Sequence, residues 1–143
     1  MSFTTCLIIM GGGALGTLMR YLVSVLALPV SRDLPWGTIA INITGSFLIG
    51  FVGTLTLAQG RYPVSDNMRL FVMVGFCGGY TTFSSFSLQT LDLIRAGALG
   101  RAGINVAVSV VLCVAAVALG HLWAAQLNGH AAQIAEVTIE EEA

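Results

Sequence analysis

Near the middle of the chain, the stretch from Gly75 to Ser87 reads GFCGGYTTFSSFS. Three glycines followed by a run of hydroxyl residues disfavour a continuous helix, because glycine is a poor helix former and Ser and Thr compete for backbone hydrogen bonds. The stretch lies inside a longer apolar segment, so we predict a transmembrane helix that breaks at mid-span. A break at membrane depth is tolerated only where the freed backbone is buried in protein or lines a cavity. Its carbonyl groups then suit a cation, and its N–H groups suit an anion.

The chain as a whole is too apolar for a water-soluble protein. Of its 143 residues, 56% are hydrophobic and 9% are charged, and the mean hydropathy is +0.87. A soluble domain carries about 25% charged residues. We therefore predict an all-α membrane protein. The formal net charge of −1 argues against a strongly basic nucleic-acid-binding protein, so no nucleic-acid partner is expected.

Apolar runs between charged residues predict four transmembrane helices, because charges are costly in the hydrocarbon core and mark the ends of spans. The expected spans are Thr4 to Leu28, Thr38 to Leu57, Met68 to Leu93 and Ala102 to Gln126. Residues 1–126 are thus expected to form one transmembrane domain. Residues 127–143 end in three glutamates before the last alanine and are expected to form a disordered acidic tail.

Two of the spans carry polar and small residues at a spacing of four, which places them along one side of a helix. The second span has Thr38, Asn42, Ser46, Gly50 and Thr54, and the fourth has Asn105, Ser109 and Cys113. Such stripes indicate either a helix-packing seam with interhelical hydrogen bonds or a shared wet path. A primary amide in hydrocarbon must find partners or face a wet cavity, so Asn42 is a candidate pore residue.

Phe83 and Phe86 follow the predicted break and point the same way on the helix that resumes there. Two aromatics at this spacing are more often core residues than site residues, but these two are embedded in hydroxyl groups. The glycines from Gly11 to Gly16 match a nucleotide-binding pattern, yet no alternation of strands and helices follows them. A close-packing surface that includes Gly12 and Gly16 explains the same glycines.

The centres of the four spans contain no carboxylate and no lysine. Proton-coupled transporters use such intramembrane groups, so passive conduction is favoured. The sequence offers no nucleophile–base pair or metal-ligand cluster, which argues against an enzyme. Four arginines lie on one predicted side and two on the other, a bias that specifies orientation weakly. The chain could therefore insert both ways round, or in one orientation with both termini outside.

The motifs resemble those of the small bacterial fluoride channels called Fluc or CrcB. The resemblance rests on the glycine-rich start leading to Arg20 and Tyr21, the Pro35 to Thr38 entry followed by Asn42, and above all the stretch from Gly75 to Ser87. It spans all four predicted helices and leaves the tail outside. The family implies an antiparallel, dual-topology homodimer in the bacterial cytoplasmic membrane that exports fluoride passively through two pores.

The resemblance also implies a role for individual residues. Phe83 and Phe86 would present their positive ring edges to fluoride, and Asn42 would donate its amide N–H to the ion. The remaining pore residues would be Thr82, Ser84, Asn105 and Ser109. Arg20 would gather anions in a vestibule. Backbone carbonyls of Gly78 and Thr81 from both subunits would hold one structural sodium ion on the dimer axis.

Two other classes of protein remain open at this point. A small dual-topology multidrug or cation antiporter can also have four spans, but it needs a membrane-embedded carboxylate, which this sequence lacks. A structural subunit without transport would explain the glycines. It would not explain the clustered break, hydroxyl groups and phenylalanines.

Overall fold

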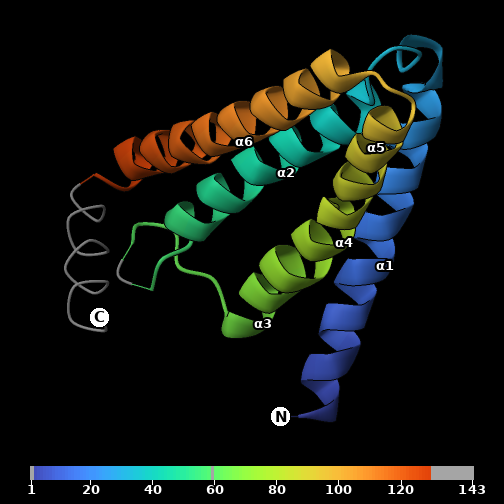
Figure 1. The fold of residues 1–143 in the computed structure, drawn as a ribbon. Helices are drawn as coiled ribbons and strands as arrows, with labels where there is room; N and C mark the ends of the chain where they lie inside the picture. The colour runs from blue at the N-terminus through green and yellow to red at the C-terminus, as the bar shows by residue number, and fades with distance from the viewer. Residues whose placement is uncertain (1, 59, 130–143) are drawn as a thin grey trace.

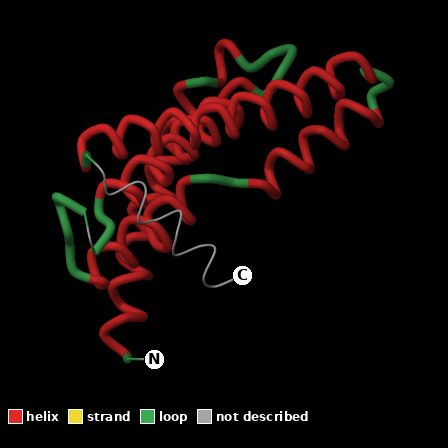
Figure 2. The backbone as a smooth tube through the Cα atoms, turned by 90° about the vertical axis from the view of Figure 1, so that its left-hand side faces the viewer, coloured by secondary structure: helices red, strands yellow, loops and turns green. Residues whose placement is uncertain are grey.

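The computed structural model describes residues 2–58 and 60–129, and within these ranges the protein is entirely helical. Figure 2, coloured by secondary structure, shows helices joined by loops and turns. Three helices are long and apolar enough to cross a membrane: α1 (Phe3–Leu26), α2 (Trp36–Leu55) and α6 (Leu99–Asn128). A short 3₁₀ turn, η1 (Leu28–Val30), follows α1. The predicted all-α membrane protein is confirmed.

The third span is divided, as the glycines and hydroxyl residues predicted. Its first half runs without interruption through α3 (Asp66–Arg69), the π-helical η2 (Leu70–Cys77) and α4 (Gly78–Tyr80). Thr81 and Thr82 then take extended conformations, and the helix resumes as α5 (Phe83–Arg95). π-Helical turns are rare and often accompany functional sites.

The predicted span ends lie within three residues of the observed ones. The largest difference is three residues, at the start of α6, and at its other end α6 continues past Gln126 to Asn128. Asn128 is buried, because its side chain bonds to the end of α2. Residues 130–143, which include most of the expected acidic tail, lie outside the described residues.

Helix α1 packs against the first half of the third span through glycines. A Cβ atom at Gly12 would collide with the carbonyl oxygen of Phe71, and one at Gly16 with that of Phe76. Seen from the other helix, a Cβ atom at Gly75 would lie 2.8 Å from the carbonyl oxygen of Ile9. Residue numbers increase in the same direction along both helices at this contact, from Gly12 against Phe71 to Gly16 against Phe76, so the two helices are parallel. Lipid provides no hydrophobic driving force for helix association. The close backbone approach stabilises the helix pair through van der Waals packing instead. The packing interpretation of these glycines is confirmed.

Helix α2 packs in the same way on α6. A Cβ atom at Gly50 would collide with the carbonyl oxygen of Val117, and one at Gly120 with that of Phe47. One turn further along, Thr54 Oγ1 lies 2.8 Å from His121 Nδ1. The same separation of 67 residues joins Thr54 to His121 and Gly50 to Val117, so α2 and α6 also run in the same direction.

The subunit is therefore built from two pairs of parallel helices. In Figure 1 the α2–α6 pair and the pair formed by α1 and the third span lie close together near α5 and spread apart toward α3. At the closed end, Arg101 Nη1 lies 3.1 Å from Asp33 Oδ1 and links the start of α6 to the loop before α2. This ion pair is exposed and contributes little stability. The candidate site lies in the space between the two pairs.

Candidate functional site

A cavity of about 390 Å³ lies between α2, the third span and α6. Seven of the ten site residues predicted from the sequence line it: Asn42, Gly78, Thr81, Thr82, Phe83, Phe86 and Ser109. None of the described residues that line it is charged. The structure thus brings together residues from three spans that are up to 67 positions apart in the sequence.

The break in the third span is held by the side chain of Asn42. Its Nδ2 donates a hydrogen bond to the carbonyl oxygen of Thr82 at 3.1 Å, and its Oδ1 accepts one from the Thr82 N–H at 2.8 Å. The opposite amide orientation would place like groups against each other, so the network assigns this one. One N–H of the Asn42 amide takes no part in this pair and remains for another acceptor.

The break also releases carbonyl groups from the helix. In a continuous helix the N–H of Thr82 would bond to the carbonyl of Gly78, and that of Ser85 to the carbonyl of Thr81. Here the Thr82 N–H bonds to Asn42, and the Ser85 N–H bonds to Thr82 Oγ1 at 3.1 Å. The carbonyls of Gly78 and Thr81 therefore lose their helical donors. These are the two groups that the family resemblance implied for a cation.

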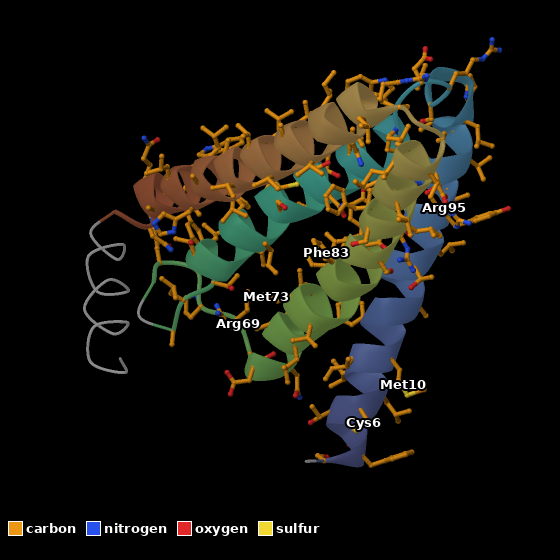
Figure 3. All side chains as sticks on the ribbon, viewed as in Figure 1. Cys6, Met10, Arg69, Met73, Phe83 and Arg95 are labelled. Carbon is orange, nitrogen blue, oxygen red and sulfur yellow. The ribbon has the colours of Figure 1, made fainter. Side chains whose placement is uncertain are left out.

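Helix α5 begins inside the cavity with its two phenylalanines. Thr82 caps the helix, because its Oγ1 accepts a hydrogen bond from the Ser85 N–H, one of the first N–H groups of α5. The rings of Phe83 and Phe86 lie 5.4 Å apart at an interplanar angle of 45°. Phe83 is 79% exposed in the subunit, although it is a large aromatic residue. Figure 3 labels Phe83 on the third span, beside the gap that separates it from α2.

The polar stripe of α6 faces that of α2. The separation of 67 residues that sets the pairing of these helices places Ser109 level with Asn42, and Cys113 level with Ser46. Ser109 is 6% exposed, and its hydroxyl has no hydrogen-bond partner among the described residues. The cavity is lined by all four residues of these two level pairs, Asn42 with Ser109 and Ser46 with Cys113. A buried hydroxyl without a partner is costly unless a ligand or water satisfies it.

Asn105 lies one turn before Ser109 and is fully buried. Its Nδ2 donates to Thr90 Oγ1 at 2.8 Å, while its Oδ1 has no partner within the described part of the chain. The same is true of the buried Gln89 Oε1 on α5. Asn105 is not among the residues that line the cavity, so its place in the polar track stays a prediction.

The structure does not bring Arg20 or Ser84 into the cavity lining. Arg20 is half-buried on α1, one turn beyond Gly16, whose contact with Tyr80 places Arg20 level with the start of α5. Ser84 is exposed, and its Oγ lies 3.3 Å from Thr82 Oγ1. The vestibule role of Arg20 and the pore role of Ser84 stay predictions.

Sequence reasoning gave no local role to Gly45. A Cβ atom there would collide with the methyl group of Thr81 and lie 3.2 Å from the Tyr80 ring. Next to it, Thr44 Oγ1 lies 2.9 Å from the Tyr80 hydroxyl. Gly45 therefore lets α2 approach the break closely enough for Asn42 to reach Thr82. The only sequence signal was a glycine beside the polar stripe.

Comparison with known proteins places the chain among close relatives. A sequence model of the family described as CrcB-like protein, Camphor Resistance (CrcB), matches residues 7–121. A protein of Methylobacterium radiotolerans named fluoride-specific ion channel FluC is 75% identical over 142 residues, which cover 99% of both chains. Proteins of the same name from Gluconobacter oxydans and Rhodospirillum rubrum are 72% and 50% identical. They cover 100% and 87% of this chain, and 100% and 97% of their own length.

The Asn42 contacts lead to a prediction about stability. Asn42→Ala leaves the N–H and carbonyl of Thr82 without partners, and each unsatisfied buried group costs about 1–3 kcal/mol. We expect the free energy of unfolding in detergent to fall by about 2–4 kcal/mol, measured by circular dichroism during denaturation. Asn42→Asp keeps the acceptor for the Thr82 N–H, so its free energy of unfolding should lie between those of Asn42→Ala and the unmodified protein. Ser46→Ala, one turn along the same face, is the control. An equal loss in Ser46→Ala would contradict a special role for the amide.

Proposed function

This chain belongs to the CrcB-like protein family, and on that premise we propose that it is a fluoride-selective channel that lets fluoride leave the cytoplasm passively. The proposed location is the bacterial cytoplasmic membrane. One observation carries the proposal: a cavity that no charged residue of the described chain lines, in which the Phe83 and Phe86 rings, the start of α5 and a Ser109 hydroxyl without a described hydrogen-bond partner converge. Close relatives bear the name fluoride-specific ion channel FluC, which supports it.

The cavity offers fluoride several weak donors in place of its hydration shell. The Ser109 O–H and the remaining Asn42 N–H can donate hydrogen bonds, and an aromatic ring is positive at its edge. The N-terminal end of α5 adds a partial positive charge. No lysine or arginine lines the cavity. A permeating ion must bind well enough to enter and weakly enough to leave, which favours such uncharged donors.

We further propose that two copies assemble as an inverted homodimer. Phe83 is exposed and faces an open space between two helix pairs, so a single subunit does not enclose the proposed pore. Gly78 is also exposed, and a Cβ atom added there would have no described atom of the same subunit within 4 Å. The weak arginine asymmetry fits insertion both ways round. A second copy would close the pore from the open side.

The residues at the break fit a structural sodium ion. Hard cations prefer oxygen ligands, and the carbonyls of Gly78 and Thr81 have lost their helical donors. We propose that these carbonyls, contributed by both copies, hold the ion. When bound, it supplies a positive charge that lowers the cost of bringing anions into a low dielectric. Thr81 Oγ1 donates to the carbonyl of Cys77 at 2.9 Å, so its side chain secures the turn.

The antiporter alternative finds no support in the site. Exchange of protons for a substrate needs a carboxylate within the spans, and the two acidic residues of the third span, Asp66 and Asp92, lie near its two ends and are exposed. No acidic residue lines the cavity among the residues that the structure describes.

Fluoride efflux from liposomes that contain only this protein tests the function directly. We expect rapid efflux down the fluoride gradient, read with a fluoride electrode, and no comparable chloride efflux under the same conditions. Protein-free liposomes control for leakage. Equal fluoride and chloride fluxes would contradict the proposed selectivity. A flux that depends on a proton gradient would contradict passive conduction and favour coupled transport.

The phenylalanines separate conduction from packing. Phe→Ile keeps most of the volume and apolarity, so a core role predicts a loss of stability of about 1 kcal/mol with flux retained. A pore role predicts a normally assembled protein with strongly reduced flux, because isoleucine has no positive edge. Efflux is measured for Phe83→Ile and Phe86→Ile, normalised to protein recovered by size-exclusion chromatography. Full flux in both variants would reject the proposed mechanism.

Inverted assembly predicts that the loop between α2 and α3 appears on both sides of the membrane. A cysteine placed at the exposed position Val64, in a background where the three native cysteines are serine, should react with an impermeant maleimide in about half of the molecules in intact cells. Permeabilised cells provide the total. Complete labelling from outside, or none, would exclude dual topology.

A further inference from the structure

The C-terminal end of α2 is capped by side chains from two other spans. Arg69 Nη1 donates to the carbonyl oxygens of Thr56 at 2.7 Å and Gly53 at 3.2 Å, and to Thr56 Oγ1 at 2.8 Å. Asn128 Nδ2 donates to the carbonyls of Thr54 at 2.7 Å and Leu55 at 3.2 Å. The carbonyls that a helix end leaves without partners are thereby satisfied. Arg69 itself is half-buried.

No carboxylate of the described residues forms an ion pair with Arg69. Among residues 2–58 and 60–129, the one ion pair joins Arg101 to Asp33, at the other end of the subunit. Asp66, three residues before Arg69, is exposed and forms no ion pair with it. The end of a helix carries only about half a negative charge, so net positive charge remains here. All the hydrogen bonds of this guanidinium to described residues use Nη1, which leaves Nη2 and Nε for other acceptors.

Arg69 lies directly beyond one end of the cavity. Met73, one turn further along the third span, lines the cavity, and its Cε lies 3.0 Å from where a Cβ atom of Gly53 would be. Gly53 is also a partner of Arg69, so both side chains reach the same turn of α2. Figure 3 shows Arg69 and Met73 next to each other near the open end of the two helix pairs. Arg20 lies on the other side of the break.

We propose that Arg69 is an anion-collecting residue at this mouth of the pore. The inference rests on the proposed fluoride conduction and adds to it a second positive group, one turn beyond the uncharged cavity. An unneutralised charge beside a low-dielectric cleft raises the local concentration of anions. An ionisable group within a membrane span that lacks an opposite charge is expected to have such a functional reason. In an inverted dimer, each face of the membrane would present Arg69 of one copy and Arg20 of the other.

The experiment measures initial fluoride efflux from liposomes against internal fluoride concentration, at low and at high ionic strength. For Arg69→Gln we expect the half-saturating fluoride concentration to rise roughly three- to ten-fold at low salt, with the saturating flux per recovered protein unchanged. At about 0.5 M of an impermeant salt the difference should shrink to less than about two-fold, because salt screens the charge. Arg69→Lys keeps the charge and should restore the half-saturating concentration.

Two control variants separate the charge from the helix cap. Thr56→Val removes one acceptor of the guanidinium and leaves its charge, so the half-saturating concentration should stay unchanged. Asp66→Asn removes the nearby negative charge at an exposed position and should lower it by up to about two-fold at low salt. This second variant tests the proposal even if Arg69→Gln is not recovered as folded protein.

Other outcomes would overturn the inference while leaving the channel function intact. If Arg69→Gln reduces only saturating flux or folded yield, or if Thr56→Val reproduces its effect, Arg69 is a helix cap and nothing more. If Asp66→Asn leaves the half-saturating concentration unchanged at low salt, the charge at this mouth does not act on fluoride. Absence of fluoride flux in the unmodified protein would instead reject the proposed function itself.

Discussion

A peptide group inside a bilayer must find its hydrogen-bond partner within the protein, and the rest of this structure depends on how that requirement is met at Thr82. The third span breaks where water cannot compensate, so the cost of the break would be several kcal/mol if the backbone were left unpaired. The Asn42 side-chain amide forms hydrogen bonds with both the N–H and the carbonyl of Thr82. The bond from the Thr82 N–H to Asn42 frees the carbonyl of Gly78, and the bond from the Ser85 N–H to Thr82 Oγ1 frees that of Thr81.

The glycine contacts make this arrangement possible. Asn42 has a short side chain, and it reaches Thr82 only because Gly45 lets α2 lie directly against Thr81. The glycines of α1 and η2 then fix the height of the break, and Gly50 and Gly120 fix α6 beside α2. Small residues thus set distances that hydrophobic packing alone would not set in a lipid environment.

The cavity is chemically suited to an anion because its polar groups are donors without full charges. The same helices place two arginines outside it that form no ion pair with described residues, Arg69 beyond one end and Arg20 on the other side of the break. A fixed charge within the cavity would hold fluoride, whereas a charge at the mouth raises its local concentration and leaves the path itself weakly binding. This division between mouth and path connects the proposed conduction to the inferred role of Arg69.

The sequence by itself determined the spans, the break and the glycine surfaces. A hydrocarbon core admits few charges, so the span ends could be placed within a few residues, and the composition from Gly75 to Ser87 disfavoured a continuous helix. It also identified most residues of the cavity, partly through the polar stripes at a spacing of four and partly through family resemblance.

Only the tertiary structure decided which groups meet. That Asn42 bonds to the Thr82 backbone, that Ser109 lies level with Asn42, and that Arg69 and Asn128 close the end of α2 depend on the offset and rotation of one helix against another. A helical stripe indicates which side of a helix is polar but not the height at which it meets its neighbour. That height follows from backbone contacts at a few glycines, which involve residues far apart in the chain and leave no local signal.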